Sequence, residues 1–191
     1  EQALLNLLIK ENGISLEKYF DVNTKNEIQV NALVGFESLN ETISLIENFI
    51  VEGYKTVKLK IGRENFFDDL KIISELRKRF NDKIIIRLDA NCKWSLTEAK
   101  NNLKSLEDFS IEYVEQPIAN VKEFRRINTT IPLAADESIR NLEDAESIIE
   151  NELADIIILK PMLTGGLVNS IEIIKAAQKK NIKTVVTTSL D

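Results

Sequence analysis

Five charged side chains recur through the sequence, each directly after a run of apolar residues. In chain order they are Lys60, Asp89, Glu115, Asp136 and Lys160. Three acids therefore lie between two lysines, and each charge comes at the end of an apolar, β-branched segment that predicts a strand. If they converge, three carboxylates in a chain without histidine favour a hard cation that prefers oxygen ligands. Mg²⁺ is the simplest candidate, and Mn²⁺ is the alternative ion.

The two lysines predict proton transfer beside that cation. An unperturbed lysine, with a pKa of about 10.4, is too basic to accept a proton at neutral pH. A nearby metal ion and a second ammonium group lower that pKa. Lys58 lies two residues before Lys60, on the same face of the strand, and is the candidate source of this like charge. We therefore expect Lys60 to remove a proton next to a substrate carboxylate, while the metal stabilises the enediolate.

Several neighbours of these charges are supporting candidates. Glu137 is interpreted either as a further metal ligand or as a residue behind the ligands. Asn91 and Arg87 either orient the carboxylates or satisfy backbone groups of a loop. Ser189, in the final TTSLD stretch, is also a supporting candidate, whereas Cys92 is interpreted as a small buried residue and not as a nucleophile.

The elements that must position these residues alternate between strands and helices. Strands are predicted at residues 27–34, 56–61, 83–89, 111–115, 132–135, 155–159 and 183–188. Helices are predicted at residues 1–10, 38–51, 66–80, 95–106, 121–127, 142–151 and 168–179. Strict alternation predicts a parallel sheet. In a (β/α) barrel the carboxyl ends of such strands share one rim, which carries the chemistry.

The predicted fold is therefore α/β, an incomplete (β/α) barrel with seven strands. Residues 27–191 would form this partial catalytic barrel, and residues 1–26 a helix and connector that lead into it. An open doubly wound sheet is the alternative, but it should carry a glycine fingerprint after its first strand. The corresponding stretch, VGFESLN, has a single glycine.

Composition narrows the classes of function. The net charge of −6 disfavours nucleic acid and anionic membranes as partners. The single cysteine fits a reducing cytoplasm, and no apolar run reaches membrane-spanning length. The absence of histidine excludes Ser-His and Cys-His catalysis within this chain. We expect a cytoplasmic enzyme that acts on a small-molecule carboxylate, and the sequence leaves a homo-oligomer open.

The motifs that contain these charges resemble those of the enolase superfamily, in its muconate-lactonizing subgroup. They are KLK, DAN, EQP, DES and LKP, and they follow the order and spacing of that family across residues 27–191. Members use a lysine or histidine base together with Mg²⁺. The resemblance implies that Asp89, Glu115 and Asp136 are the Mg²⁺ ligands. It also implies that Lys60 and Lys160 are the acid/base pair.

Within the subgroup, the chain is most similar to the o-succinylbenzoate synthases, in LKPMLTGGL, RLDAN and TTSLD. That resemblance implies dehydration of 2-succinyl-6-hydroxy-2,4-cyclohexadiene-1-carboxylate, a step of menaquinone biosynthesis. Lys60 would take the proton and Lys160 would stay cationic on the opposite face. The alternatives are a dipeptide epimerase or an N-succinylamino acid racemase, which use the same two lysines for 1,1-proton transfer, and a non-catalytic barrel scaffold.

The family pattern also implies parts beyond this chain. Its members are nearly twice as long, and they begin with an α+β capping domain that closes over the substrate. Residues 1–10 resemble the helix that leads out of that domain. We therefore expect the chain to be a fragment without its capping domain and eighth strand, and to be inactive by itself.

Overall fold

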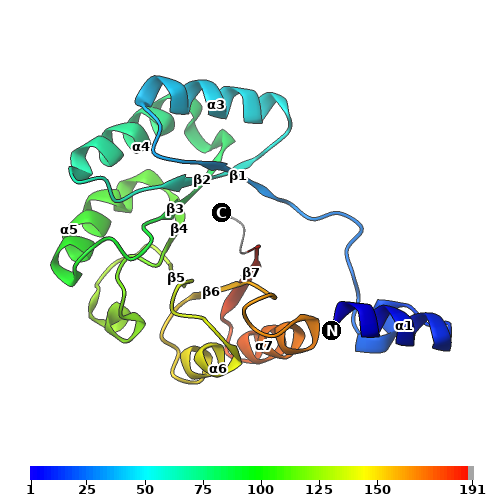
Figure 1. The fold of residues 1–191 in the computed structure, drawn as a ribbon. Coiled ribbons are helices and arrows are strands. Elements are labelled where there is room, and N and C mark those ends of the chain that lie inside the picture. The colour runs from blue at the N-terminus through cyan, green and yellow to red at the C-terminus, as the bar shows by residue number, and fades with distance from the viewer. Residues whose placement is uncertain (189–191) are drawn as a thin grey trace.

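Seven parallel strands form one curled sheet in the computed structural model, which describes residues 1–188. The strand order follows the chain, from β1 to β7. The strands are β1 (Asn31–Val34), β2 (Thr56–Lys60), β3 (Ile85–Asp89), β4 (Ile111–Glu115), β5 (Leu133–Ala135), β6 (Ile156–Leu159) and β7 (Lys183–Val186). Figure 1 shows the sheet curving like part of a barrel, with helices on its outer side. The predicted α/β partial barrel is confirmed.

Helices lie between successive strands, as the alternating pattern predicted, and two α-helices precede β1. The α-helices are α1 (Gln2–Asn12), α2 (Leu16–Phe20), α3 (Leu39–Val51), α4 (Phe66–Phe80), α5 (Leu96–Leu106), α6 (Leu142–Glu150) and α7 (Leu167–Lys179). Short 3₁₀ helices lie at η1 (Asn81–Lys83), η2 (Glu107–Phe109) and η3 (Val121–Arg126). In the described part of the chain, no helix is both long and apolar enough to cross a membrane.

Several boundaries differ from the sequence prediction, most of them by one or two residues. Strand β1 begins at Asn31 and not at residue 27, because its first partner on β2 is Thr56 and the preceding residues have no strand to pair with. The helix expected at residues 121–127 is the 3₁₀ helix η3. The predicted connector contains the short helix α2, which Ser15 caps.

Side-chain caps fix where the helices around the site begin. Ser38 and Glu41 form a capping box at the start of α3, and Ser95 and Glu98 form another at α5. In each, the serine oxygen accepts from a backbone N–H and the glutamate accepts in return, so two otherwise unpaired donors are satisfied. Asn141 caps α6, because its side-chain oxygen accepts from the backbone N–H of Asp144 at 2.8 Å. Each βα loop therefore ends at a defined residue.

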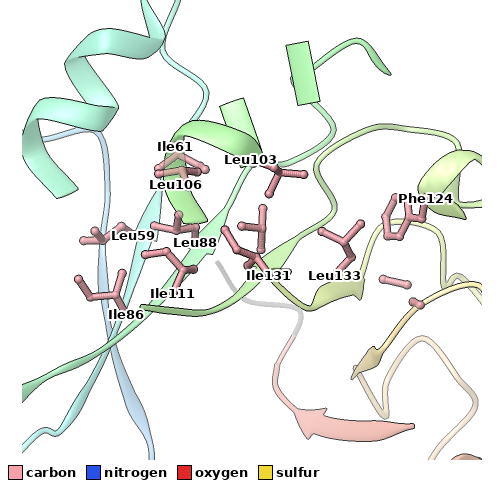
Figure 2. Packing of buried hydrophobic residues seen from close by; sticks show 14 of the residues in the cluster. Leu59, Ile61, Ile86, Leu88, Leu103, Leu106, Ile111, Phe124, Ile131 and Leu133 are labelled. Carbon is pink, nitrogen blue, oxygen red and sulfur yellow. The ribbon is translucent and has the colours of Figure 1, made fainter. Parts of the chain in front are cut away.

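The main apolar core lies between the sheet and its helices. Alternate residues of the strands, such as Leu59, Ile86 and Leu88, are buried against the helix side chains Leu103 and Leu106 (Figure 2). Because side chains alternate across a strand, the residues between them point to the inside of the curved sheet. Those inward positions carry most of the charged residues identified above.

The N-terminal helix α1 lies beside α7, and α2 and an extended segment lead from it to β1 (Figure 1). Its contact with the rest of the molecule includes Glu1, whose Oε1 accepts from the backbone N–H of Val168 at 2.9 Å. Val168 is in the first turn of α7, where the unpaired N–H groups and the helix dipole favour a carboxylate. No comparison tests the division at residues 26 and 27, which stays a prediction.

Candidate active site

The strand register brings the charged residues to one rim. Lys60 lies beside Asp89 in the β2–β3 pairing, and Asp89 lies beside Glu115 in the β3–β4 pairing. Asp136 directly follows the last residue of β5, and Lys160 directly follows the last residue of β6. Because parallel strands end on the same side, the five predicted residues form a row along the carboxyl edge of the sheet.

The three acids in this row are almost completely buried. Asp89, Glu115 and Asp136 are 1%, 1% and 3% exposed. An isolated carboxylate is very costly to remove from water, so such groups require counter-charges or hydrogen-bond donors. The sequence alone, which suggested solvated loop residues as the ordinary alternative, did not establish this burial.

Lys58 supplies the counter-charge for two of the acids. Its Nζ lies 2.7 Å from Glu115 Oε1 and 3.0 Å from Asp89 Oδ2. Burial disfavours the ammonium, but attraction to Glu115 and Asp89 outweighs that cost and raises the pKa of Lys58. The side chain therefore bridges the two carboxylates as a cation.

Burial and the neighbouring Asp89 charge raise the pKa of Glu115 to about 8, against the opposing influence of Lys58. An acid that resists ionisation in this way gains most from an added positive charge. The row of charges therefore favours an added cation.

Lys160 pairs with the third acid. Its Nζ lies 2.9 Å from Asp136 Oδ2. The backbone N–H of Asp136 donates to the Gln116 Oε1 atom at 2.8 Å, and the Ser138 N–H donates to the same oxygen at 3.2 Å. The Gln116 amide nitrogen donates to the Ile118 carbonyl and to Ser138 Oγ. Gln116 is therefore the residue that fixes the loop after β5.

Sequence reasoning missed Gln116 as a site residue. Its side chain is fully buried, and its φ of 38° is an unusual backbone conformation for a residue other than glycine. The available signal was its position in VEQP, directly after a strand-end acid. That signal is weak, because it does not show that the amide reaches across to the next βα loop.

Lys60 has an amide and not an acid as its partner. Its Nζ donates to Asn91 Oδ1 at 3.3 Å, and Asn91 Nδ2 donates to Glu137 Oε1 at 2.9 Å. The Oε2 atom of Glu137 is buried and has no hydrogen-bond partner. Burial raises the pKa of Glu137. The supporting candidates Asn91 and Glu137 therefore lie in one chain of contacts that ends at Lys60.

The loop that follows Lys60 is held by a second residue that the sequence did not indicate. Asp69 is buried, and its Oδ2 accepts from the backbone N–H groups of Gly62 and Arg63 at 2.7 and 3.0 Å. Gly62 has a φ of 99°, which favours glycine, and a Cβ there would lie 2.8 Å from a side-chain carbon of Lys93. The exit from β2 is therefore closely packed.

The remaining supporting candidates lie elsewhere. Arg87 pairs with Lys58 in the register, one layer below the row, and binds Glu112 at 2.6 Å and Asn31 at 3.3 Å. Its described partners thus include none of the three buried strand-end acids. Ser189 lies outside the described residues.

A cavity of about 140 Å³ lies inside the curved sheet, below the row of charges. Its lining includes Lys58, Lys60, Glu115, Tyr113 and Leu33. Larger hollows, of about 440 and 530 Å³, lie toward the amino ends of β5 to β7 and contain none of the five strand-end charges. The smaller cavity is therefore the space that adjoins the candidate chemistry.

The side chains at this rim are chemically suited to bind a hard divalent cation. All three acids offer oxygen, and their burial and the raised pKa of Glu115 favour additional positive charge. In the present arrangement of residues 1–188, no three acidic, cysteine or histidine side chains already surround one point as metal ligands would. Lysine ammonium groups lie against the carboxylate oxygens instead.

Comparison with known proteins identifies the family. The enolase C-terminal domain-like family matches residues 41–189. An L-Ala-D/L-Glu epimerase from Francisella tularensis subsp. novicida is 30% identical over 190 residues, covering 96% of this chain and 53% of the relative. An o-succinylbenzoate synthase from Mycobacterium leprae is 32% identical over 172 residues, covering 87% and 49%.

The fold comparison agrees with the sequence comparison. The muconate lactonizing enzyme from Pseudomonas putida superimposes with a TM-score of 0.82 and 25% identity, covering 92% of this chain and 50% of that one. The chain therefore spans about half the length of the relatives it matches. The chain belongs to the enolase C-terminal domain-like family, in the muconate-lactonizing subgroup of the enolase superfamily.

Proposed function

We propose that this rim removes a proton from the carbon next to a substrate carboxylate. The observation that carries the proposal is the order of groups along the rim. Lys60 and Lys160 lie at its two ends, and three buried acids lie between them. This order provides an amine on either side of a substrate and a place for positive charge in the middle.

Asp89, Glu115 and Asp136 would hold Mg²⁺, with Mn²⁺ as the alternative ion. Bound there, the ion would supply positive charge for the substrate carboxylate oxygens as they gain electron density. Asn91 accepts a hydrogen bond from Lys60, and a neutral amine can still donate that bond. The lone pair of Lys60 would then be available to the substrate.

The finer proposal is dehydration of the o-succinylbenzoate synthase type. Lys60 takes the proton from the carbon next to the carboxylate, and the hydroxyl on the neighbouring carbon leaves as its bond breaks. Lys60 returns the proton to that hydroxide, so that one water departs and the ring becomes aromatic. Lys160, cationic and paired with Asp136, stabilises charge from the other face. The synthase relatives and the LKP and TTSLD motifs support this reaction.

A second candidate, 1,1-proton transfer on a dipeptide, is favoured by the epimerase relatives. The Francisella epimerase covers more of this chain than the synthase does. In that reaction, Lys60 and Lys160 would exchange roles, one removing the proton and the other returning it to the opposite face. Because identities of 30% and 32% do not separate the two activities, the assay must compare both substrates.

A non-catalytic scaffold is the third reading. It gives no reason to retain three buried acids, because buried charges stabilise a fold less well than apolar residues of similar size. We therefore place it behind the two enzymatic candidates.

The deciding experiment offers both substrates, with Mg²⁺, to purified protein that includes the capping domain and eighth strand expected from the family. Loss of the cyclohexadiene absorbance reports dehydration, and exchange of the α-proton of L-Ala-L-Glu with solvent deuterium reports epimerisation. In Lys60→Ala we expect the productive reaction to fall by about a thousandfold, as for removal of a general base. The control is Lys55→Ala, an exposed lysine just before β2, which should keep full activity.

Dehydration without dipeptide exchange supports the synthase, and exchange without dehydration supports the epimerase. Full activity in Lys60→Ala would remove Lys60 from the proposed role. Inactivity on both substrates in a protein that binds Mg²⁺ would favour the scaffold.

A further inference from the structure

Lys58 has the most unusual position of the lysines along this rim. Its ammonium contacts two different carboxylates, Glu115 at 2.7 Å and Asp89 at 3.0 Å. The Lys160 ammonium forms an ion pair with Asp136, and Lys60 donates to the Asn91 amide. Lys58 therefore stands between two of the carboxylates assigned to the metal.

We propose that Lys58 is an internal counter-ion that a divalent metal displaces. In the metal-free protein it holds Asp89 and Glu115 together, and metal binding moves it out from between them. This inference rests on the proposed metal site, but it does not depend on which substrate the enzyme uses.

The first argument is that the two cations compete for the same oxygens. Mg²⁺ requires oxygen ligands at about 2.0–2.1 Å in a near-octahedral arrangement. The Lys58 ammonium already contacts one oxygen of each acid at hydrogen-bond distance. A dication between Asp89 and Glu115 would lie close to this ammonium, in a place where water cannot screen their repulsion.

The second argument is that the structure has space into which the Lys58 ammonium can move. Its side chain is 15% exposed, whereas the Asp89 and Glu115 side chains are 2% and 1% exposed. It also lines the cavity of about 140 Å³, together with Leu33, Val185 and other inward-facing residues. A lysine has a flexible four-carbon stem, so its head can turn into this space while its backbone stays in β2.

The third argument is that the site requires some cation at all times. Asp89 and Glu115 are buried beside each other in the β3–β4 pairing, and the Lys58 ammonium contacts an oxygen of each. An internal ammonium keeps the acids apposed before the metal arrives. The metal must then compete with the Lys58 ammonium for Asp89 and Glu115. Lys58 should therefore weaken metal affinity while it stabilises the metal-free state.

The test is a calorimetric titration of purified protein with Mg²⁺ and with Mn²⁺, without substrate. Lys58→Met keeps the length of the side chain and removes its charge. Lys60→Met is the matched control, because it removes the same charge from the same face of β2 at a lysine whose ammonium donates to the Asn91 amide. We expect Lys58→Met to bind metal at least about tenfold more tightly than wild type, and Lys60→Met to change much less.

An equal gain in both variants would mean that only the overall charge matters, and it would overturn the proposal. Weaker binding in Lys58→Met would mean that Lys58 organises the site for the metal, which also overturns it. Failure of the wild type and Lys58→Met to bind either ion would overturn both this inference and the metal site. Metal binding without turnover of either substrate would count against the proposed function alone.

A second measurement uses wild-type protein, in case Lys58→Met does not fold. Brief acetylation followed by peptide mass spectrometry reports how accessible each lysine amine is. Saturating Mg²⁺ should increase the modification of Lys58 by about tenfold, because a released amine leaves its ion pairs with Asp89 and Glu115 and becomes more exposed. Lys55, which is already exposed, is the internal control and should not change. Unchanged modification of Lys58 at full metal occupancy would overturn the displacement.

Discussion

The two faces of the curled sheet are built from the same strands but carry different residues and have different roles. Leu88 and Asp89 are consecutive on β3, and they are 0% and 1% exposed. Leu88 packs in the apolar core on the helix side, whereas Asp89 lies beside Lys58 on the inner side. Burying Leu88 stabilises the fold through its contacts, while burying Asp89 is unfavourable until a cation pairs with it. We infer that the helix side determines stability and the inner side determines chemistry.

The largest effect should come from a change on the inner face. In Asp89→Asn the shape is kept and one proposed metal ligand loses its charge, so we expect turnover to fall by about a thousandfold, or about 4 kcal/mol of transition-state stabilisation. The unfolding free energy of the metal-free protein should change by less than about 1 kcal/mol, because a costly buried charge disappears while Lys58 keeps its ion pair with Glu115. Turnover and urea unfolding measure the two quantities. A large loss of stability with little loss of turnover would contradict the assignment.

The matched change on the outer face should have the reverse pattern. Leu88→Ala leaves a cavity in the core, and we expect it to lower the unfolding free energy by about 3 kcal/mol. Turnover per folded molecule should stay within about twofold of wild type, because the residue does not face the rim. If Leu88→Ala reduced turnover per folded molecule as much as Asp89→Asn does, the two faces would not be separable in this way.

The smallest predicted effect concerns how burial and the acids of the inner face change the pKa of the nearby Cys92 thiol. Burial, with Glu137, Asp136 and Asp89 nearby, raises the pKa of the Cys92 thiol to about 11. A free thiol has a pKa of about 8.5, so at pH 8 the alkylation of Cys92 should be about a hundredfold slower. Because the thiolate fraction rises about tenfold per pH unit below the pKa, the rate should increase about tenfold per pH unit up to about pH 11. The measurement is iodoacetamide labelling of metal-free protein, with urea-unfolded protein as control. A plateau near pH 9 would show that the rim carries less negative charge than its geometry indicates.

Much of this organisation was available from local patterns. The capping boxes at Ser38 and Ser95 correspond to a local pattern, a serine with a glutamate three residues later. The strand ends at Lys60, Asp89 and Glu115 followed from apolar runs that stop at a charge. The start of β1 was placed four residues early, since an extended stretch becomes a strand only where a partner is present to receive its hydrogen bonds.

The sequence by itself determined the residue types, their order and their shared family pattern. These are local or linear properties, and they were sufficient for the α/β partial barrel and the row of five charges. Only the tertiary structure decided the contacts among them: Lys58 lies between Asp89 and Glu115, and Gln116 holds the loop of Asp136. Such contacts join residues from different strands. Their geometry depends on strand register and on the burial of polar groups, which no single segment encodes.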